Sequence, residues 1–272
     1  MPATTKLATT TRTDDEALAR ALDFERRLHR GACERAVAHP LGEAFFTPAI
    51  EQMWVLNQLF VDARATAPAL AAALDELYGH VRHRRATTAL PAVGAALAPA
   101  FAAVGWQIQR NVLMALRRER DRPPEPGLAR EVDGRALRAV EAKTIAEEGN
   151  RSPELVEQLL DGRAAFARAG RARYFVGAVD GVDACHATLY SDGVIAQVED
   201  VGTVTAFRGR GLARAVCCAA IDAALAAGHE LVIIAADDED WPKGLYGRLG
   251  FDVVGREWCF TWPGPAPPAH PS

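Results

Sequence analysis

The stretch FRGRGLARAV, residues 207–216, stands between an apolar run and an alanine-rich segment that is typical of a helix. A glycine-rich turn where a helix begins leaves several backbone amides without partners, at the end where the helix dipole is positive. Gly209 and Gly211 allow a ligand to approach the backbone closely, and Arg208 and Arg210 suit charge-assisted hydrogen bonds to phosphate. The stretch therefore predicts an anion site that a pyrophosphate would fit.

Two other kinds of phosphate-binding turn match this stretch less well. A P-loop requires GxxxxGK followed by Ser or Thr, and the sequence contains no such run. A dinucleotide-binding turn requires a small residue where Arg214 stands, because that residue packs the helix against the strand. Asp237 and Asp238 end the next apolar run, where dinucleotide-binding proteins carry an acidic residue. An NAD-dependent oxidoreductase therefore remains an alternative.

The segments around the motif predict a defined order of elements. Asp180 and Gly181 lie between two apolar runs and indicate a β-hairpin. A helical region is expected at about 134–170, strands at 173–179, 182–190 and 194–204, a helix at 211–227, a strand at 230–236, a short helix at 241–249 and a strand at 253–260. Three antiparallel strands thus precede the motif, and a buried strand follows its helix.

Residues 173–260 resemble the GNAT superfamily of acyl-CoA-dependent N-acetyltransferases. Arg208, Gly211 and Ala213 match the RxxGxA motif of that family. A second block of the family, a short helix with Leu-Tyr followed by Gly-Phe, is supplied by Leu245, Tyr246, Gly250 and Phe251. The resemblance implies an α+β fold in which a mixed, mainly antiparallel sheet is flanked by helices. It also implies acetyl-CoA as cosubstrate and an amine as acceptor.

The resemblance assigns a binding role to the strand and loop around the motif. The residues expected to hold acetyl-CoA are Val201, Thr203, Val204, Arg208, Gly209, Arg210, Gly211, Leu212 and Ala213. A backbone amide of the strand at 201–204 would meet the oxyanion. Gly202 would ease a bulge that separates this strand from its parallel neighbour and admits the pantetheine arm.

Acetyl transfer to an amine also needs a base and an acid. Glu199 is the candidate base, because a carboxylate on the strand before the loop is usual in the family. With a period of two, Glu199 shares a strand face with Gln197, Val201 and Thr203, whereas Asp200 faces the other way. Gln197 is an alternative position for the acid-base group, and Glu199 is alternatively a solvated carboxylate. The resemblance makes Tyr246 the proton donor to the departing thiolate.

The first half of the sequence matches the second at a constant offset of 145 residues, as between Gly105 and Gly250. The offset places the segment ARATAP, residues 63–68, on RGRGLA, and Phe101 on Tyr246. This copy lacks the glycines and the hydroxyl, so it is expected to bind no CoA. The sequence thus predicts two GNAT-like domains in tandem, a degenerate one at 14–122 and a catalytic one at 123–262. Disordered ends are expected at 1–13 and 263–272.

Aromatic residues in the first half are expected to be mainly core. Two strands are predicted within 42–50 and 53–62, and they carry Phe45, Phe46, Trp54 and Phe60. The acidic run at 237–240 either favours a cationic acceptor or is a solvated helix start.

Composition limits the remaining possibilities. A net charge of −4 argues against partners such as nucleic acid or anionic membrane. The five cysteines form no CxxC pair and the histidines no ligand set, so a cytoplasmic protein without a metal is expected. Cys217 and Cys218 are expected to pack in a helix rather than to act as nucleophiles. A non-enzymatic alternative is a sensor that binds acyl-CoA without transfer, and the oligomeric state is open.

Overall fold

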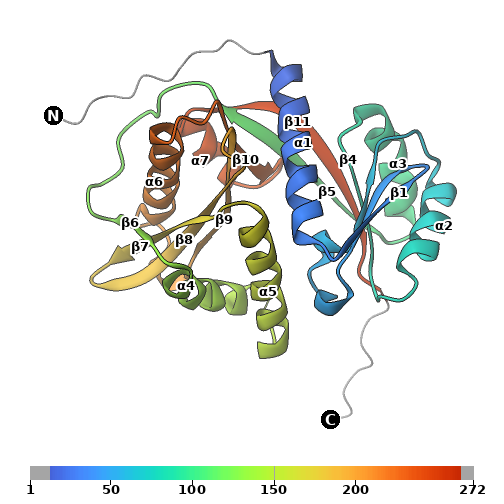
Figure 1. The fold of residues 1–272 in the computed structure, drawn as a ribbon, viewed down its shortest axis with the longest axis horizontal. Helices are drawn as coiled ribbons and strands as arrows, with labels where there is room; N and C mark the ends of the chain where they lie inside the picture. The colour runs from blue at the N-terminus through green and yellow to red at the C-terminus, as the bar shows by residue number, and fades with distance from the viewer. Residues whose placement is uncertain (1–12, 150, 265–272) are drawn as a thin grey trace. The chain divides into compact units, whose positions relative to one another are not determined.

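The computed structural model describes residues 13–149 and 151–264 (Figure 1). The α-helices are α1 (Asp14–Ala32), α2 (Ala67–Tyr78), α3 (Pro91–Ala103), α4 (Gly134–Glu147), α5 (Pro153–Ala169), α6 (Leu212–Ala226) and α7 (Pro242–Arg248). The strands are β1 (Arg35–His39), β2 (Gly42–Phe46), β3 (Gln58–Val61), β4 (Arg84–Thr88), β5 (Gln107–Leu116), β6 (Ala129–Val132), β7 (Arg173–Val179), β8 (Val182–Ser191), β9 (Ile195–Thr203), β10 (Leu231–Asp237) and β11 (Phe251–Trp262). Short 3-10 helices lie at Pro48–Ile50, Trp54–Leu56 and Thr205–Phe207.

The chain divides into two compact units, and neither is a continuous half of the sequence. The larger unit combines Met1–Ala32 with Val112–Gly255, and the smaller unit combines Cys33–Asn111 with Arg256–Ser272. These units differ from the expected domains at 14–122 and 123–262, because β5 and β11 each contribute residues to both units. The expected disordered ends lie outside the described residues, apart from Thr13, Pro263 and Gly264.

Helix α1 belongs with the larger unit although it begins the chain. It packs against α5, and Arg27 donates to Asp192 with an Nη2–Oδ2 distance of 2.8 Å. Its start is capped, since the Glu16 amide donates to the Thr13 hydroxyl at 3.2 Å. The N-terminal helix therefore covers the sheet formed by the second half of the sequence.

The sheet of the larger unit has the strand order β11-β5-β10-β9-β8-β7-β6. Strands β6 to β9 are antiparallel, and β9 pairs with β10 in parallel. The hairpin between β7 and β8 is confirmed, with positive φ at Asp180 (54°) and Gly181 (76°). The expected helical region is two helices, α4 and α5, and α5 begins at Pro153 with Ser152 as its N-cap.

The two faces of this sheet carry different neighbours. Cys185, Ala187 and Leu189 of β8 join the apolar core that α6 covers. The alternate residues of β8, among them His186 and Tyr190, point to the opposite face, where α4 and α5 lie (Figure 1). The α6 face is thus apolar, whereas the α4–α5 face holds buried polar side chains.

The smaller unit has the strand order β1-β2-β3-β4-β11-β5. Its core contains Tyr78, Phe101 and Phe260, and the Tyr78 hydroxyl donates to the Phe45 carbonyl at 3.1 Å. Phe45, Phe46 and Phe60 are buried as expected. The second expected strand is shorter than predicted, because Trp54 lies in a 3-10 helix and β3 begins at Gln58.

The two units repeat one arrangement, as the offset of 145 residues predicts. Helix α2 begins at Ala67 and helix α6 at Leu212, and Gly105 and Gly250 both adopt positive φ, 83° and 102°. The start of α2 is closed, because the Thr66 hydroxyl accepts a hydrogen bond from the Ala69 amide at 3.4 Å. The turn of the smaller unit therefore satisfies one amide with its own side chain, and Pro68 supplies none, whereas no described side chain caps the start of α6.

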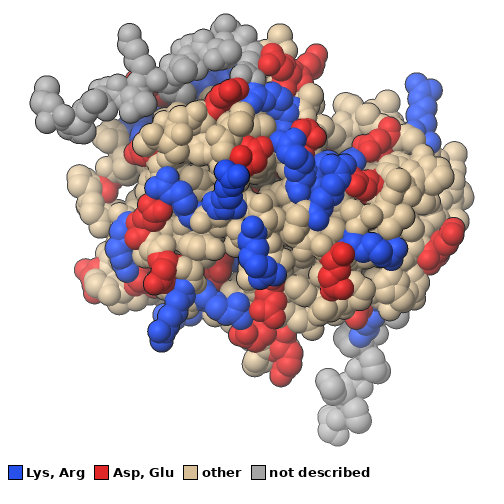
Figure 2. Space-filling model, in the orientation of Figure 1, with Lys and Arg blue, Asp and Glu red and all other residues tan. Residues whose placement is uncertain are grey.

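Acidic and basic side chains are interspersed on the face shown in Figure 2, where the described residues form no extended basic patch. No helix among the described residues is long and apolar enough to cross a membrane.

Candidate active site

The loop before α6 has the conformation that its glycines permit. Gly209 and Gly211 adopt φ of 76° and 77°, a region that side chains disfavour. The amide of Ala215 donates to the Gly211 carbonyl at 3.0 Å and starts the helix. The amides of residues 212–214 belong to the first helical turn and have no partner within the helix, and no side chain of the described residues caps this end. The start of α6 is therefore an open group of donors.

The arginines of the motif differ in their surroundings. Arg208 is exposed and its Nε donates to the Thr203 carbonyl at 3.2 Å. The guanidinium of Arg210 lies 5.3 Å from the Phe207 ring centre and 3.7 Å from a carboxylate oxygen of Asp180. Arg214 is buried, and its Nη2 donates to Asp121 at 2.7 Å. This bond fixes the segment between β5 and β6 against α6.

Strand β9 separates from β10 where it reaches this loop. The two strands pair from Ile195 to Val198 of β9, whereas β10 continues to Asp237. On its other side, β9 carries an extra residue opposite β8, and Asp200 adopts a φ of 54°. The expected bulge is therefore present, but its positive-φ residue is Asp200. Gly202 has a different role, because a Cβ there would lie 2.4 Å from Nε2 of His186.

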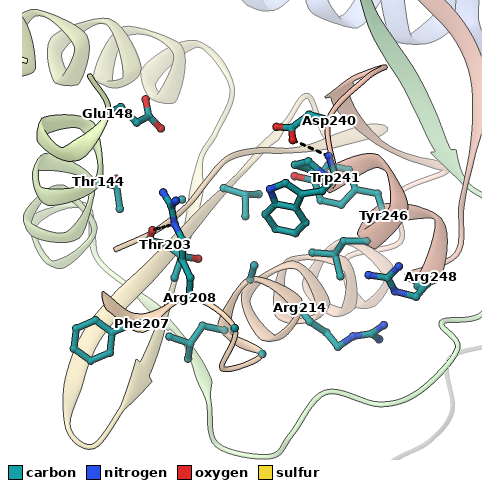
Figure 3. Close-up of a pocket in the computed structure, with 18 of the residues that line it drawn as sticks. Thr144, Glu148, Thr203, Phe207, Arg208, Arg214, Asp240, Trp241, Tyr246 and Arg248 are labelled. Carbon is teal, nitrogen blue, oxygen red and sulfur yellow. Dashed lines mark hydrogen bonds between the residues drawn. The ribbon is translucent and has the colours of Figure 1, made fainter. Parts of the chain in front are cut away.

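A cavity of about 690 Å³ occupies the opening between these elements (Figure 3). Of the expected site residues, those that line it are Val201, Thr203, Arg208, Gly209, Gly211, Leu212, Ala213 and Tyr246. Glu199, Val204 and Arg210 are not among its lining residues. The Val204 amide is already used, since it donates to the Ala184 carbonyl at 2.9 Å. Because amides alternate along a strand, that of Thr203 points toward the opening.

Tyr246 lies in α7, beside the cavity and opposite Thr144 (Figure 3). The residue is 7% exposed, and no hydrogen bond joins its hydroxyl to another described side chain. Burial raises the pKa of Tyr246, and the negative charges that Cys217 and Glu199 can carry raise it further. The phenol therefore keeps its proton and can donate it into the cavity.

Glu199 lies behind the cavity on the α4–α5 face. Its carboxylate accepts from Nε2 of Gln197 at 2.8 Å, and the same nitrogen lies 3.1 Å from Oε1 of Glu25 in α1. Burial raises the pKa of Glu199 to about 8, with a further contribution from the charge of Asp200. A carboxylate with this pKa is suited to accept a proton near neutral pH.

The bulge reverses the faces that a strict period of two predicts. Asp200 was expected to face away from Glu199, but it accepts from the Tyr190 hydroxyl at 2.6 Å on the α4–α5 face. Beyond the bulge, the Thr203 hydroxyl lies 3.1 Å from Sγ of Cys185, on the α6 face. Val201 and Thr203 therefore do not share a face with Glu199, because one extra residue shifts the alternation.

Several lining residues carry no motif that the sequence analysis recognised. Thr144 and Glu148 reach the cavity from the region of α4, and Trp241, Asp240 and Arg248 from that of α7 (Figure 3). Trp241 is 66% exposed and presents a large apolar surface. In the sequence, the one feature that marks Trp241 is its place at the start of a helix.

The acidic run before α7 acts mainly within its own turn. Asp237 accepts from the Glu239 amide at 2.9 Å, and Asp240 from the Trp241 amide at 2.7 Å. Lys243 donates to Asp238 with an Nζ–Oδ1 distance of 2.7 Å. Of the run, Asp240 lines the cavity.

The cysteines near the site are part of the core. Cys217 is fully buried, and burial raises its pKa well above the ordinary value, so the thiol stays protonated. Among the described residues, no group of His, Cys, Asp and Glu side chains could hold a metal ion.

Comparison with solved structures finds related folds over most of the chain. A functionally unknown conserved protein from Staphylococcus epidermidis matches with a TM-score of 0.65 and 12% identity, over 85% of this chain and 94% of that one. A GCN5-related N-acetyltransferase from Kribbella flavida matches with a TM-score of 0.62 and 19% identity, over 92% of this chain and 96% of that one. A GNAT-family protein from Novosphingobium aromaticivorans matches with a TM-score of 0.50 and 18% identity, over 75% and 86%. No protein-family model and no curated protein matches the sequence.

Proposed function

We propose that this chain, which has the fold of the GCN5-related N-acetyltransferases, transfers an acyl group from acyl-CoA to an amine, with acetyl-CoA as the expected donor. One observation carries the proposal. The opening between β9 and β10 joins the open amides of α6 to the Tyr246 hydroxyl within a single cavity. A ligand with a pyrophosphate and a reactive thioester needs both features at once.

The residues present fit such a ligand. The uncapped start of α6 and the exposed guanidinium of Arg208 would hold the pyrophosphate. A cavity of about 690 Å³ is of the size usual for ligand sites. The smaller unit has its corresponding helix capped by Thr66, so the proposal assigns no CoA binding and no transfer to that unit.

The chemistry requires that a proton leave the amine and that another reach the sulfur. Bound acyl-CoA would supply the thioester carbonyl that the amine attacks and the thiolate that leaves. Glu199 would accept the amine proton, through water because its carboxylate lies behind the cavity. The Thr203 amide would donate to the carbonyl oxygen as negative charge develops there. Tyr246 would donate its proton to the sulfur.

The five free cysteines fit a reducing compartment, and we therefore propose that the reaction takes place in the cytoplasm.

Thermal unfolding with acetyl-CoA, CoA and NAD, each added separately, tests the proposal. Acetyl-CoA at about 100 times its dissociation constant should stabilise the protein by about 2.7 kcal/mol. The variant Arg208→Ala/Gly211→Asp should lose this shift. Arg64→Ala is the matched control, because Arg64 is exposed in the corresponding loop of the smaller unit.

A second measurement follows the release of the CoA thiol with a panel of amines. Amine-dependent release by the wild type supports the proposal. Binding of acetyl-CoA without release from any amine would favour the sensor, and stabilisation by NAD alone would favour the oxidoreductase. Either result would overturn acyl transfer.

A further inference from the structure

The bulge in β9 places a residue with a side chain in the left-handed region. Asp200 has a φ of 54°, a conformation that aspartate adopts less readily than glycine but more readily than most residues. This residue directly follows Glu199 and lies where β9 has left β10. Contacts to Asp200 can therefore stabilise the bulge that lies between Glu199 and Thr203.

Two side chains from other elements hold the Asp200 carboxylate. The Tyr190 hydroxyl of β8 donates to Oδ2 at 2.6 Å, and Nε of Arg163, in α5, lies 3.1 Å from Oδ1. Nη1 of Arg163 also donates to Oε1 of Glu141, in α4, at 3.2 Å. The three charged side chains are 21%, 18% and 6% exposed for Arg163, Asp200 and Glu141. One largely buried guanidinium thus connects α4, α5 and the bulge.

Arg163 is also the cation that pairs with both Asp200 and Glu141. The polar and charged groups around Glu199, Asp200 and Glu141 are Glu25 of α1, Arg138 and Glu141 of α4, Arg163 of α5, His186 and Tyr190 of β8, Gln197 of β9 and Tyr246 of α7. His186 is buried, and burial lowers its pKa to about 3, so it is neutral. Arg163 therefore offsets the charges of Asp200 and Glu141 beside the carboxyl of Glu199.

We propose that Arg163 is a positioning residue, which holds Asp200 in the left-handed conformation and thereby places Glu199 and the Thr203 amide for acyl transfer. The proposal rests on the acyl transfer proposed above. Arg163 does not line the cavity of the candidate active site, so its loss should leave acetyl-CoA binding intact. Its loss also removes the cation that pairs with Asp200 and Glu141, which makes a negative charge on Glu199 less favourable.

The test compares the pH profiles of kcat and KM for two substitutions at Arg163. Arg163→Met should lower kcat by about tenfold to a hundredfold, a range typical of a misplaced catalytic group, with KM for acetyl-CoA unchanged. The rising limb of the kcat–pH profile of Arg163→Met should lie at a higher pH than that of the wild type. Arg163→Lys keeps the positive charge but cannot contact Asp200 and Glu141 at the same time. Its kcat should therefore fall, while the rising limb of its pH profile stays at the pH of the wild type. Arg168→Met is the control, because Arg168 is exposed in the last turn of the same helix, α5, and the variant should match the wild type.

Asp200→Gly keeps the test decisive if Arg163→Met folds poorly. Glycine adopts a φ of 54° without a carboxylate to hold, so adding Arg163→Met to Asp200→Gly should change kcat less than twofold. The proposal is wrong if Arg163→Met behaves as Arg168→Met, if only KM changes in Arg163→Met, or if Arg163→Met and Asp200→Gly lower kcat independently.

A physical measurement separates this inference from the proposed function. If the wild type transfers no acyl group, the carboxyl of Glu199 is followed by NMR with carbon-13 glutamate, assigned through Glu199→Gln. A titration midpoint that rises in Arg163→Met upholds the role of Arg163, and an unchanged midpoint refutes it.

Discussion

Replacing Glu199 by glutamine should remove one limb of the pH profile of acyl transfer. Burial raises the pKa of this carboxyl to about 8, so about one tenth of it is ionised at pH 7 and most of it at pH 9. If the ionised form accepts the amine proton, kcat of the wild type should rise about tenfold between these two pH values and then level off. Glu199→Gln should lower the plateau by about 10²-fold to 10⁴-fold and abolish the levelling near pH 8.

The assay is release of the CoA thiol at saturating acetyl-CoA and amine, from pH 6 to 10. Glu230→Gln is the matched control, because Glu230 is a carboxylate of the same unit whose side chain is 54% exposed. If Glu199→Gln keeps the kcat of the wild type and the levelling of its pH profile near pH 8, another group accepts the proton. Such a result would refute the assignment of the base while leaving acetyl-CoA binding untouched.

Four further outcomes follow from the structure. Tyr246→Phe should lower kcat by about 10²-fold to 10⁴-fold with the acetyl-CoA affinity from calorimetry retained, and an equal loss of affinity would contradict its role as proton donor. Gly209→Ala should weaken acetyl-CoA binding and cost about 1 kcal/mol of unfolding free energy in urea, because a side chain is strained at a φ of 76°. Gly202→Ala should lower the melting temperature by displacing His186, and an unchanged value would argue against that close contact. Because the pKa of Glu199 is raised, the folded state binds its proton more tightly than the unfolded state does. The free energy of unfolding should therefore fall by about 1.4 kcal/mol per pH unit as pH rises from 4.5 toward 8. Urea titrations of Glu199→Gln should lack this slope.

Local patterns in the sequence predicted the elements that depend on local chemistry. The Asp180–Gly181 hairpin and the glycines of the α6 loop both follow from residues that tolerate positive φ. Tyr246 was placed by the Leu-Tyr block of the short helix, and the structure puts it against the cavity.

Features that depend on distant packing could not be predicted in this way. The bulge at Asp200 changes which residues of β9 share a face. The guanidinium that pairs with Asp200 comes from α5, and no pattern in β9 reveals this contact. Thr144 and Glu148 reach the cavity from a helix far earlier in the chain and belong to no motif. The boundaries of the two units differ from the expected domains at 14–122 and 123–262, because β5 and β11 continue through both units and strand pairing between distant segments leaves no local signal.

The sharing of β5 and β11 has a consequence for the order in which the protein can be made. Synthesis proceeds from the N-terminus, so the ribosome releases β4 long before it reaches β11, the strand that pairs with β4 from Trp258 to Trp262. Until then, β4 has an unpaired edge that invites association with other chains. The first segment of the smaller unit, Cys33–Asn111, is translated before most of the larger unit, but the smaller unit is completed last. Premature termination near residue 255 would therefore damage the smaller unit, although most of its residues had already been made.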